Sequence, residues 1–158
     1  MLEVLKYLNE LQGIDLQIDK IAYAKEEEEK KLSVIENRIA IGKKELEDID
    51  KELSELEKNK RSSDGNLALE EERLKKSKTK INSIKNSEEH RAMLQEIDER
   101  KRIVSAIEDE NIGFIDKVEK KNKEKEKKNK EIEVALKEYE KLFAKIQELG
   151  KDCNSKID

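Results

Sequence analysis

Proline and tryptophan are absent from this 158-residue chain, and cysteine occurs once, at Cys153. A single cysteine excludes an internal disulfide and a four-cysteine metal site, so no cofactor is expected in this chain. No apolar run approaches the roughly 18 residues of a membrane-spanning helix, and the first residues lack the apolar core of a signal peptide. These absences predict a protein of the reducing cytoplasm that has no membrane contact.

Apolar residues are also scarce, at 34% of the chain, whereas charged residues make up 47%. This composition fits either a disordered polyampholyte or a long coiled coil. The net charge is −4, from 35 basic and 39 acidic residues. Because neither sign dominates, the chain is not an obvious nucleic-acid or membrane binder.

A sustained hydrophobic period favours the coiled coil, because a polar chain does not keep a heptad register by chance. Two such seams break off together at Asn82–Glu88. The first contains Leu32, Ile35, Ile39, Leu46, Ile49, Leu53, Leu56, Leu67, Leu74, Ile81 and Ile84, and the second contains Met93, Ile97, Val104, Ile107, Phe114, Val118, Ile132, Ala135, Tyr139, Leu142, Ile146 and Leu149. We expect an all-α fold, a single long antiparallel coiled-coil helical hairpin with arm one at 2–81, a tip at 82–88 and arm two at 89–152.

The position of the tip is decided by charge rather than by local turn chemistry. Asp64-Gly65, within Ser62–Asn66, is the strongest local turn signal in the chain. In an antiparallel hairpin, however, the residue numbers of any two facing residues add up to the same value. A tip near residue 85 gives a value of about 171. That sum places the acidic run 45–57 opposite the basic run 117–130, and Glu70–Glu72 opposite Arg100–Arg102. We therefore expect Ser62–Asn66 to be a kink or local unwinding in arm one.

The tip and the open end are the candidate partner-binding surfaces. At the tip we single out Asn86, Glu89, His90 and Glu96. Each also has a structural interpretation: Asn86 or Ser87 as the N-cap of arm two, Glu89 and Glu96 as partners of opposite lysines, and His90 as a seam residue. At the open end, the excess apolar surface contains Val4, Tyr7, Tyr139 and Phe143, which can pack internally or dock a partner.

The segment after the tip resembles a bacterial family that joins an N-terminal coiled-coil hook to a C-terminal four-cysteine zinc ribbon, including chlamydial and flagellar-type proteins. The family pattern is Asn-x-Lys-Glu-Tyr-x-Ala-Leu-x-x-Glu-Ile, followed by Leu-Glu-Asp-Glu. Its matches here are Asn86, Glu89, Ala92, Glu96, Ile97, Glu108, Asp109 and Glu110, and its departures are Glu88, His90 and Met93. Leu8–Asp15 also looks like the opening of the family. The paired Cys-x-x-Cys motifs are missing, so the resemblance covers the hook alone, and zinc is expected only in the ribbon that this chain lacks.

The resemblance implies a cytoplasmic adaptor linked to transcription by sigma-54 RNA polymerase and to flagellar or type III secretion export. We expect a non-enzymatic protein–protein interaction module, because no nucleophile–base pair or phosphate loop is present. Self-association through the open end is compatible with this expectation. Two alternatives remain: an RNA-binding hairpin that uses Lys117–Lys130, and a purely structural coiled-coil spacer. The first is opposed by the interleaved glutamates and by the lack of aromatic residues in that run.

Overall fold

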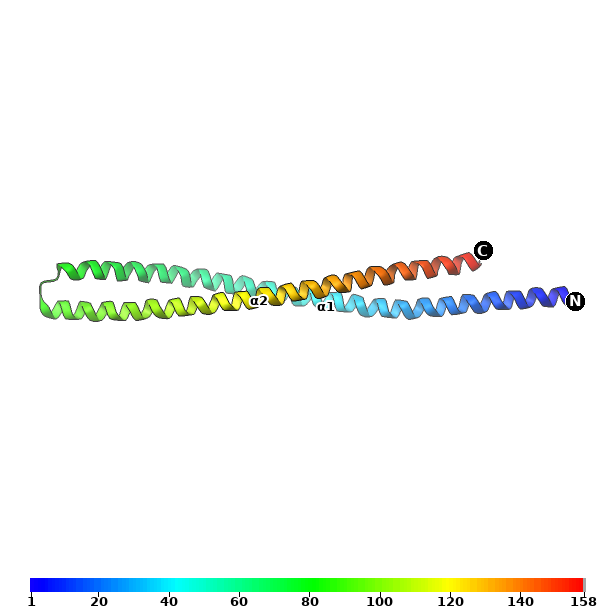
Figure 1. Cartoon of the computed structure of the whole chain (residues 1–158), viewed down its shortest axis with the longest axis horizontal. Helices are drawn as coiled ribbons and strands as arrows, with labels where there is room; N and C mark the ends of the chain where they lie inside the picture. Colours follow the sequence, from blue (N-terminus) through cyan, green and yellow to red (C-terminus); the bar gives the residue numbers. More distant parts are fainter. Residues whose placement is uncertain (158) are drawn as a thin grey trace. The chain divides into compact units, whose positions relative to one another are not determined.

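A computed structural model describes residues 1–157 and confirms an all-α helical hairpin (Figure 1). Helix α1 spans Leu2–Lys80, a short 3-10 helix η1 spans Ile81–Ser83, and helix α2 spans Ser87–Ile157. The described residues contain no β-strand. The two long helices run in opposite directions and are joined by a connection of only a few residues.

Charge pairs along each helix explain why such a polar sequence is helical. Acidic residues lie four positions before lysine in Glu47–Lys51, Glu72–Lys76 and Glu133–Lys137, each with an ion pair of 3.3–3.7 Å. Such pairs stabilise a helix by about 0.2–0.5 kcal/mol each. Their contributions support the helices locally, while contact between the helices supplies the remaining stability.

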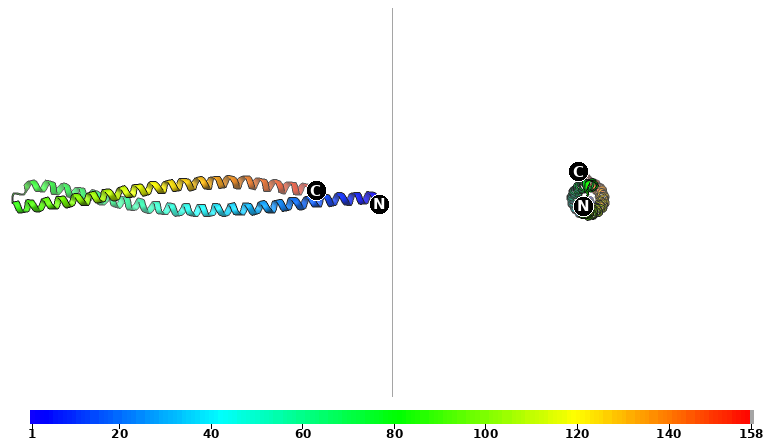
Figure 2. Two further views of the ribbon diagram at one scale, coloured as in Figure 1. Left: turned by 60° about the horizontal axis from the view of Figure 1, so that its bottom comes forward. Right: turned by 90° about the vertical axis from the view of Figure 1, so that its left-hand side faces the viewer.

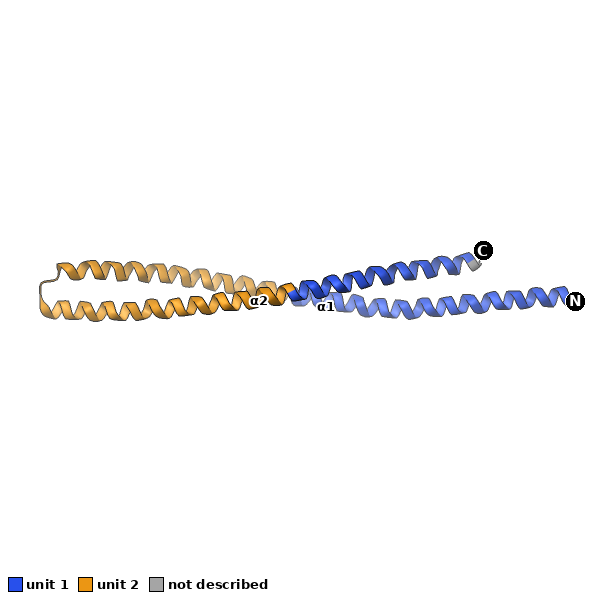
Figure 3. Cartoon of the chain, in the orientation of Figure 1, with its two compact units in different colours: residues 1–46, 127–158 blue, residues 47–126 orange. Residues whose placement is uncertain are grey.

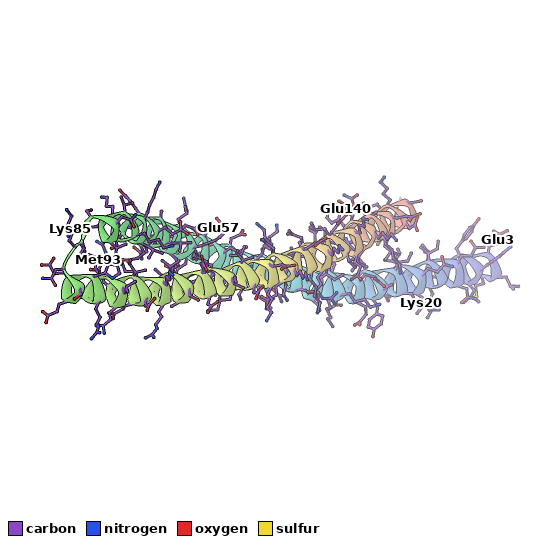
Figure 4. The ribbon with its side chains drawn as sticks, turned by 60° about the vertical axis from the view of Figure 1, so that its left-hand side comes forward. Glu3, Lys20, Glu57, Lys85, Met93 and Glu140 are labelled. Carbon is purple, nitrogen blue, oxygen red and sulfur yellow. The ribbon has the colours of Figure 1, made fainter. Side chains whose placement is uncertain are left out.

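The tip lies inside the predicted interval of 82–88. The chain leaves η1 at Ile84, which is extended and donates its backbone N–H to the carbonyl of Ile81 at 3.2 Å. The side-chain oxygen of Asn86 then accepts a hydrogen bond from the backbone N–H of Glu88 at 2.9 Å. Asn86 is thus the N-cap, one of the two residues considered for this role, and α2 starts at Ser87. Lys85 lies on the connection itself (Figure 4).

The segment Ser62–Asn66 stays α-helical and forms no turn. Gly65 has no positive φ, so its backbone conformation is one that any residue can adopt. The local unwinding that we considered for this segment is therefore not found, because a helix supported by contacts along its length tolerates one glycine at a cost of about 1 kcal/mol. A bend of the helix axis at this point stays a prediction.

The side chains that face between the helices follow a strict alternation of three and four residues. In α1 the buried or half-buried positions run 18, 21, 25, 28, 32 and so on to 77, with Ala24 and Glu27 as the only additions, and the same spacing continues to Ile81 in η1 and Ile84 in the connection. In α2 the series starts at Met93 and reaches Cys153. The most buried apolar side chains all belong to these series: Ile35, Ile49, Leu53, Ile97, Val104, Ala135 and Ile146. These two series define the hydrophobic seam.

The contacts divide the chain into two units, shown in Figure 3. Unit 1 contains residues 1–46 and 127–158, of which the structure describes those up to 157, and unit 2 contains residues 47–126. Within each unit, one segment of α1 and one of α2 lie side by side and antiparallel (Figure 1 and the left view of Figure 2). Each unit thus contains its own part of the seam, and the tip belongs to unit 2.

Candidate interaction surfaces

Polar contacts between the helices establish the register within unit 2. Arg100 donates to Glu70 at 3.2 Å, and Lys121 and Lys125 form ion pairs with Glu52 at 2.5 Å and Asp50 at 2.7 Å. The two residue numbers in these contacts sum to values between 170 and 175. The predicted facing of Glu70–Glu72 with Arg100–Arg102 and of 45–57 with 117–130 is confirmed by these contacts.

Unit 1 has the same register. Lys128 pairs with Glu45 at 2.5 Å, Arg38 with Glu138 at 3.3 Å, and Lys145 with Glu28 at 3.3 Å. The two helices lie close together at Gly42, where an added Cβ atom would lie 3.0 Å from the side-chain Cγ1 of Ile132. The numbers of Gly42 and Ile132 sum to 174. In each unit, the same sum pairs the seam positions of α1 with those of α2. The expected sum of about 171 is therefore three too low.

Three lysines replace apolar residues in the seam of α2, and each is neutralised across the helix pair. The hydrogen bond from Lys121 to Glu52, together with a second to Glu124, raises the pKa of the Lys121 ammonium. The hydrogen bond from Lys128 to Glu45 raises the pKa of Lys128 in the same way. Lys125 pairs with Asp50. These lysines already have acidic partners, so the basic run 117–130 offers fewer free cations to phosphate than its sequence implies.

A glutamate of unit 1 has the opposite pKa shift. Glu28 is only 13% exposed in its side chain and accepts contacts from Lys145 at 3.3 Å and Lys31 at 3.4 Å. Partial desolvation would raise the pKa of Glu28, but the hydrogen bonds and positive charges of these two lysines together outweigh it and lower the pKa. The ionised carboxylate therefore contributes to the seam as the partner of two cations.

A buried polar cluster in unit 2 was not predicted from the sequence. The amide nitrogen of Asn111 donates to Asp64 at 3.0 Å, while the Asn111 amide oxygen and the Ser63 hydroxyl are buried with no hydrogen-bond partner. Ser63 and Asn111 are 6% and 7% exposed and occupy facing seam positions. The heptad spacing alone could have located them, because both residues fall on the seam series. A buried polar pair of this kind favours one register over its neighbours.

The four tip residues are not equivalent. Asn86 caps α2, and Glu96 accepts hydrogen bonds from Arg100, which also contacts Glu70. Glu89 and His90 are exposed; the seam spacing reaches His90, three residues before Met93, but the His90 side chain is not buried there. Met93, labelled in Figure 4, is the first half-buried residue of α2. Glu89 and His90 are thus the members of the set that a partner can reach without breaking an internal contact.

The four open-end residues do not form one surface. Tyr139 is half-buried and stacks on Phe143, with ring centroids 6.0 Å apart and an interplanar angle of 11°. Because the numbers of facing residues sum to about 174, Tyr139 lies opposite Ile35. Val4 and Tyr7 are about 28 residues earlier in α1, roughly 42 Å along the helix axis. The structure therefore separates an aromatic pair from an apolar N-terminal helix end.

The N-terminal segment, residues 1–17, is exposed at every position. It includes nine large apolar side chains: Met1, Leu2, Val4, Leu5, Tyr7, Leu8, Leu11, Ile14 and Leu16. The N-terminal end of α1 extends beyond the C-terminal turns of α2 in the left view of Figure 2. Contiguous exposed apolar surface of this kind marks an interaction site in soluble proteins.

Neither a metal centre nor a membrane span is found in residues 1–157. No group of three or more histidine, cysteine, aspartate or glutamate side chains in this range could hold a metal ion, and no helix there is long and apolar enough to cross a bilayer. The fold and the exposed surfaces define an all-α helical hairpin with an uncovered apolar helix end. No protein-family model, curated protein or solved structure matches the chain.

Proposed function

We propose that this chain is a non-enzymatic protein interaction module of the cytoplasm, and that the N-terminal segment is its main binding surface. The observation that supports the proposal is the exposure of Val4, Tyr7, Leu11 and Ile14, at 61%, 66%, 58% and 40%. Their counterparts later in the same series, Ile35 and Leu53, are 9% and 7% exposed. A helix from a protein partner that covers these positions would bury them as α2 buries the rest of the seam.

A photoreactive amino acid placed at Leu11 tests this proposal in cells. Leu16 is the matched control, because it is the same residue type, is 57% exposed against 58% for Leu11, and lies off the seam series. We expect a specific protein adduct from position 11 that the Ile14→Lys change removes, and a much weaker adduct from position 16. Equal labelling from both positions, or no adduct from position 11, would reject the N-terminal segment as a binding surface and leave the structural-spacer interpretation.

The tip is proposed as a second, smaller contact surface. Glu89→Lys reverses an exposed charge that makes none of the ion pairs described for this chain, and Glu99→Lys is an equivalent change on the same helix away from the tip. Binding to a partner at the tip should weaken for Glu89→Lys and remain for Glu99→Lys. Identical recovery of a bound partner with both variants would exclude the tip from the mechanism.

The nature of the partner rests on resemblance. The links to sigma-54 and to flagellar or type III export depend on the residues Asn86–Ile97 and Glu108–Glu110, and they enter the proposal only as candidate partners. RNA binding has weaker support, because the lysines at 121, 125 and 128 already pair with acidic residues. It predicts binding that falls steeply as salt rises, and the absence of binding at low salt would exclude it.

A further inference from the structure

We propose that the partner of the N-terminal segment is the same segment of a second copy of this chain, paired antiparallel about a twofold axis. This inference rests on the proposed function, in which the N-terminal segment is a binding surface. It adds the identity of the partner and the register of the contact. Val4, Tyr7, Leu11 and Ile14 of one copy would form a seam with the same residues of the other.

The first reason is continuity with the seam inside unit 1. The buried series of α1 begins at Ile18 and continues through 21, 25 and 28 with alternating steps of three and four. Continued backwards, the same steps lead to Ile14, Leu11, Tyr7 and Val4, all of which are apolar. The last seam residue of α2, Cys153, faces the level of Ile21. The N-terminal segment therefore has the pattern of a two-helix seam but lacks a facing helix in the described residues.

The second reason is that this pattern is complementary to itself. Within unit 1, facing seam residues pair an a position of one helix with a d position of the other, as Ile132 does with Gly42. For two antiparallel copies of the N-terminal segment, a sum of about 18 places Val4 opposite Ile14 and Tyr7 opposite Leu11. This arrangement also pairs a with d. A twofold axis requires each contact to occur twice, and these pairs satisfy that condition.

The flanking positions agree with this arrangement on one side and oppose it weakly on the other. On the apolar flank, Leu8 would lie against Leu8 of the second copy across the axis, with Leu5 beside it. On the other flank, Glu10 would meet Glu10 of the second copy, and Lys6 lies one helical turn from each of them. Like charges that are exposed and close to a lysine oppose pairing only slightly. The contact area is that of a short helix pair, so we expect weak, concentration-dependent dimers.

Sedimentation equilibrium of the 158-residue chain over a wide concentration range tests the association. The mass should rise from 18.5 kDa towards twice that value as the concentration increases. Leu11→Lys should hold the protein at 18.5 kDa, whereas Leu16→Lys should dimerise like the parent. Both residues are exposed, so helicity should be unchanged in both variants, and their melting temperatures should equal that of the parent at low concentrations, where the parent is a monomer. A parent that remains a monomer throughout, or equal effects of the two variants, would overturn the proposal.

Cysteine pairing tests the register. In a Cys153→Ser background, the single variants Val4→Cys and Ile14→Cys are mixed and oxidised. The antiparallel register predicts disulfides between position 4 of one copy and position 14 of the other, with few links between identical positions. Links mainly between identical positions would show a parallel arrangement and reject the proposed geometry. The photo-crosslinking at Leu11 separates the two proposals: an adduct with a different protein, on a chain that sediments as a monomer, retains the interaction surface and rejects self-pairing.

Discussion

At the scale of single residues, two helical glycines in α1 have opposite surroundings. Gly65 would have no atom within 4 Å of an added Cβ, whereas a Cβ on Gly42 would lie 3.0 Å from Cγ1 of Ile132. Gly65→Ala should therefore raise the free energy of unfolding by about 0.5–1 kcal/mol, because alanine has the higher helix propensity. At Gly42 the same gain is opposed by crowding that typically costs about 1–3 kcal/mol.

Denaturant unfolding of the two alanine variants measures this difference. We expect Gly65→Ala to be more stable than the parent, and Gly42→Ala to be equal to the parent or less stable. Gly113→Ala is a second control, because Gly113 also has no atom within reach of an added Cβ. A stabilised Gly42→Ala would show that the helices do not approach closely at this position.

The seam lysines predict a loss of stability in alkali. The pKa values of Lys121 and Lys128 are raised above the ordinary 10.5 by hydrogen bonds to Glu52 and Glu45. A raised pKa means that the folded state holds the proton more tightly, so the contribution is complete below pH 10.5 and disappears as the pH rises through the raised values. A double variant, Lys121→Met with Lys128→Met, lacks this contribution.

Melting temperatures of the parent and of the double variant should diverge in alkali. As the pH rises past 10.5, we expect the melting temperature of the parent to fall further than that of the variant. The other lysines are common to both proteins and cancel in the comparison. Equal losses would mean that the ion pairs at Lys121 and Lys128 do not favour the folded state.

At the scale of the helices, the N-cap of α2 makes a defined contribution. Asn86 accepts the backbone N–H of Glu88 at 2.9 Å, and Glu88 and Glu89 place negative charge in the first turn. Asn86→Ala should lower the free energy of unfolding by about 1 kcal/mol. Ser87→Ala is the control, because Ser87 is already the first residue of the helix and should change stability by less than about 0.5 kcal/mol. Urea unfolding of the two variants distinguishes them, and equal losses would assign the cap to neither residue.

Much of the helical arrangement could be predicted from the sequence, because seams and charge blocks are long-range patterns. The heptad spacing indicated two helices, and the opposite charges of Glu70 and Arg100 placed the tip correctly, although Asp64-Gly65 has the stronger turn chemistry. The register was wrong by three residues, since the midpoint of the tip was used to set it. The series of buried residues is a better guide to the register. When the numbers of facing residues sum to 174, a positions of one helix face d positions of the other, as Ile132 faces Gly42. A sum of 171 does not pair these positions.

The candidate surfaces were less predictable than the fold. Exposure of Val4 and Tyr7 follows because no helix within residues 1–157 faces them, and the sequence pattern indicated it. The stacking of Tyr139 on Phe143 and the hydrogen bond between Asn111 and Asp64 depend on side-chain conformations that spacing does not specify. Likewise, Glu96 looked like an available partner contact until its hydrogen bonds with Arg100 were seen.

At the scale of the whole molecule, a disulfide between the two arms tests the register. In a Cys153→Ser background, Gly42→Cys with Ile132→Cys should oxidise within one chain, because the two β-carbons would lie within disulfide reach. Closing a loop of this length can raise the free energy of unfolding by up to about 4 kcal/mol. Gly42→Cys with Glu88→Cys is the control, since those positions would face each other only if the tip were at Gly65. A disulfide in the control pair, detected on a non-reducing gel, would contradict the hairpin described above.

The constant sum of facing residues also sets the order in which the hairpin can fold. Glu70 and Arg100 are separated by 30 residues, whereas Glu28 and Lys145 are separated by 117. Closing the longer loop first would cost about 1.2 kcal/mol more in chain entropy. Closure near the tip followed by zippering towards the termini is therefore the cheapest route, because each new layer then adds only a short loop. Substitutions near Arg100 should slow folding, whereas those near Lys145 should mainly speed unfolding.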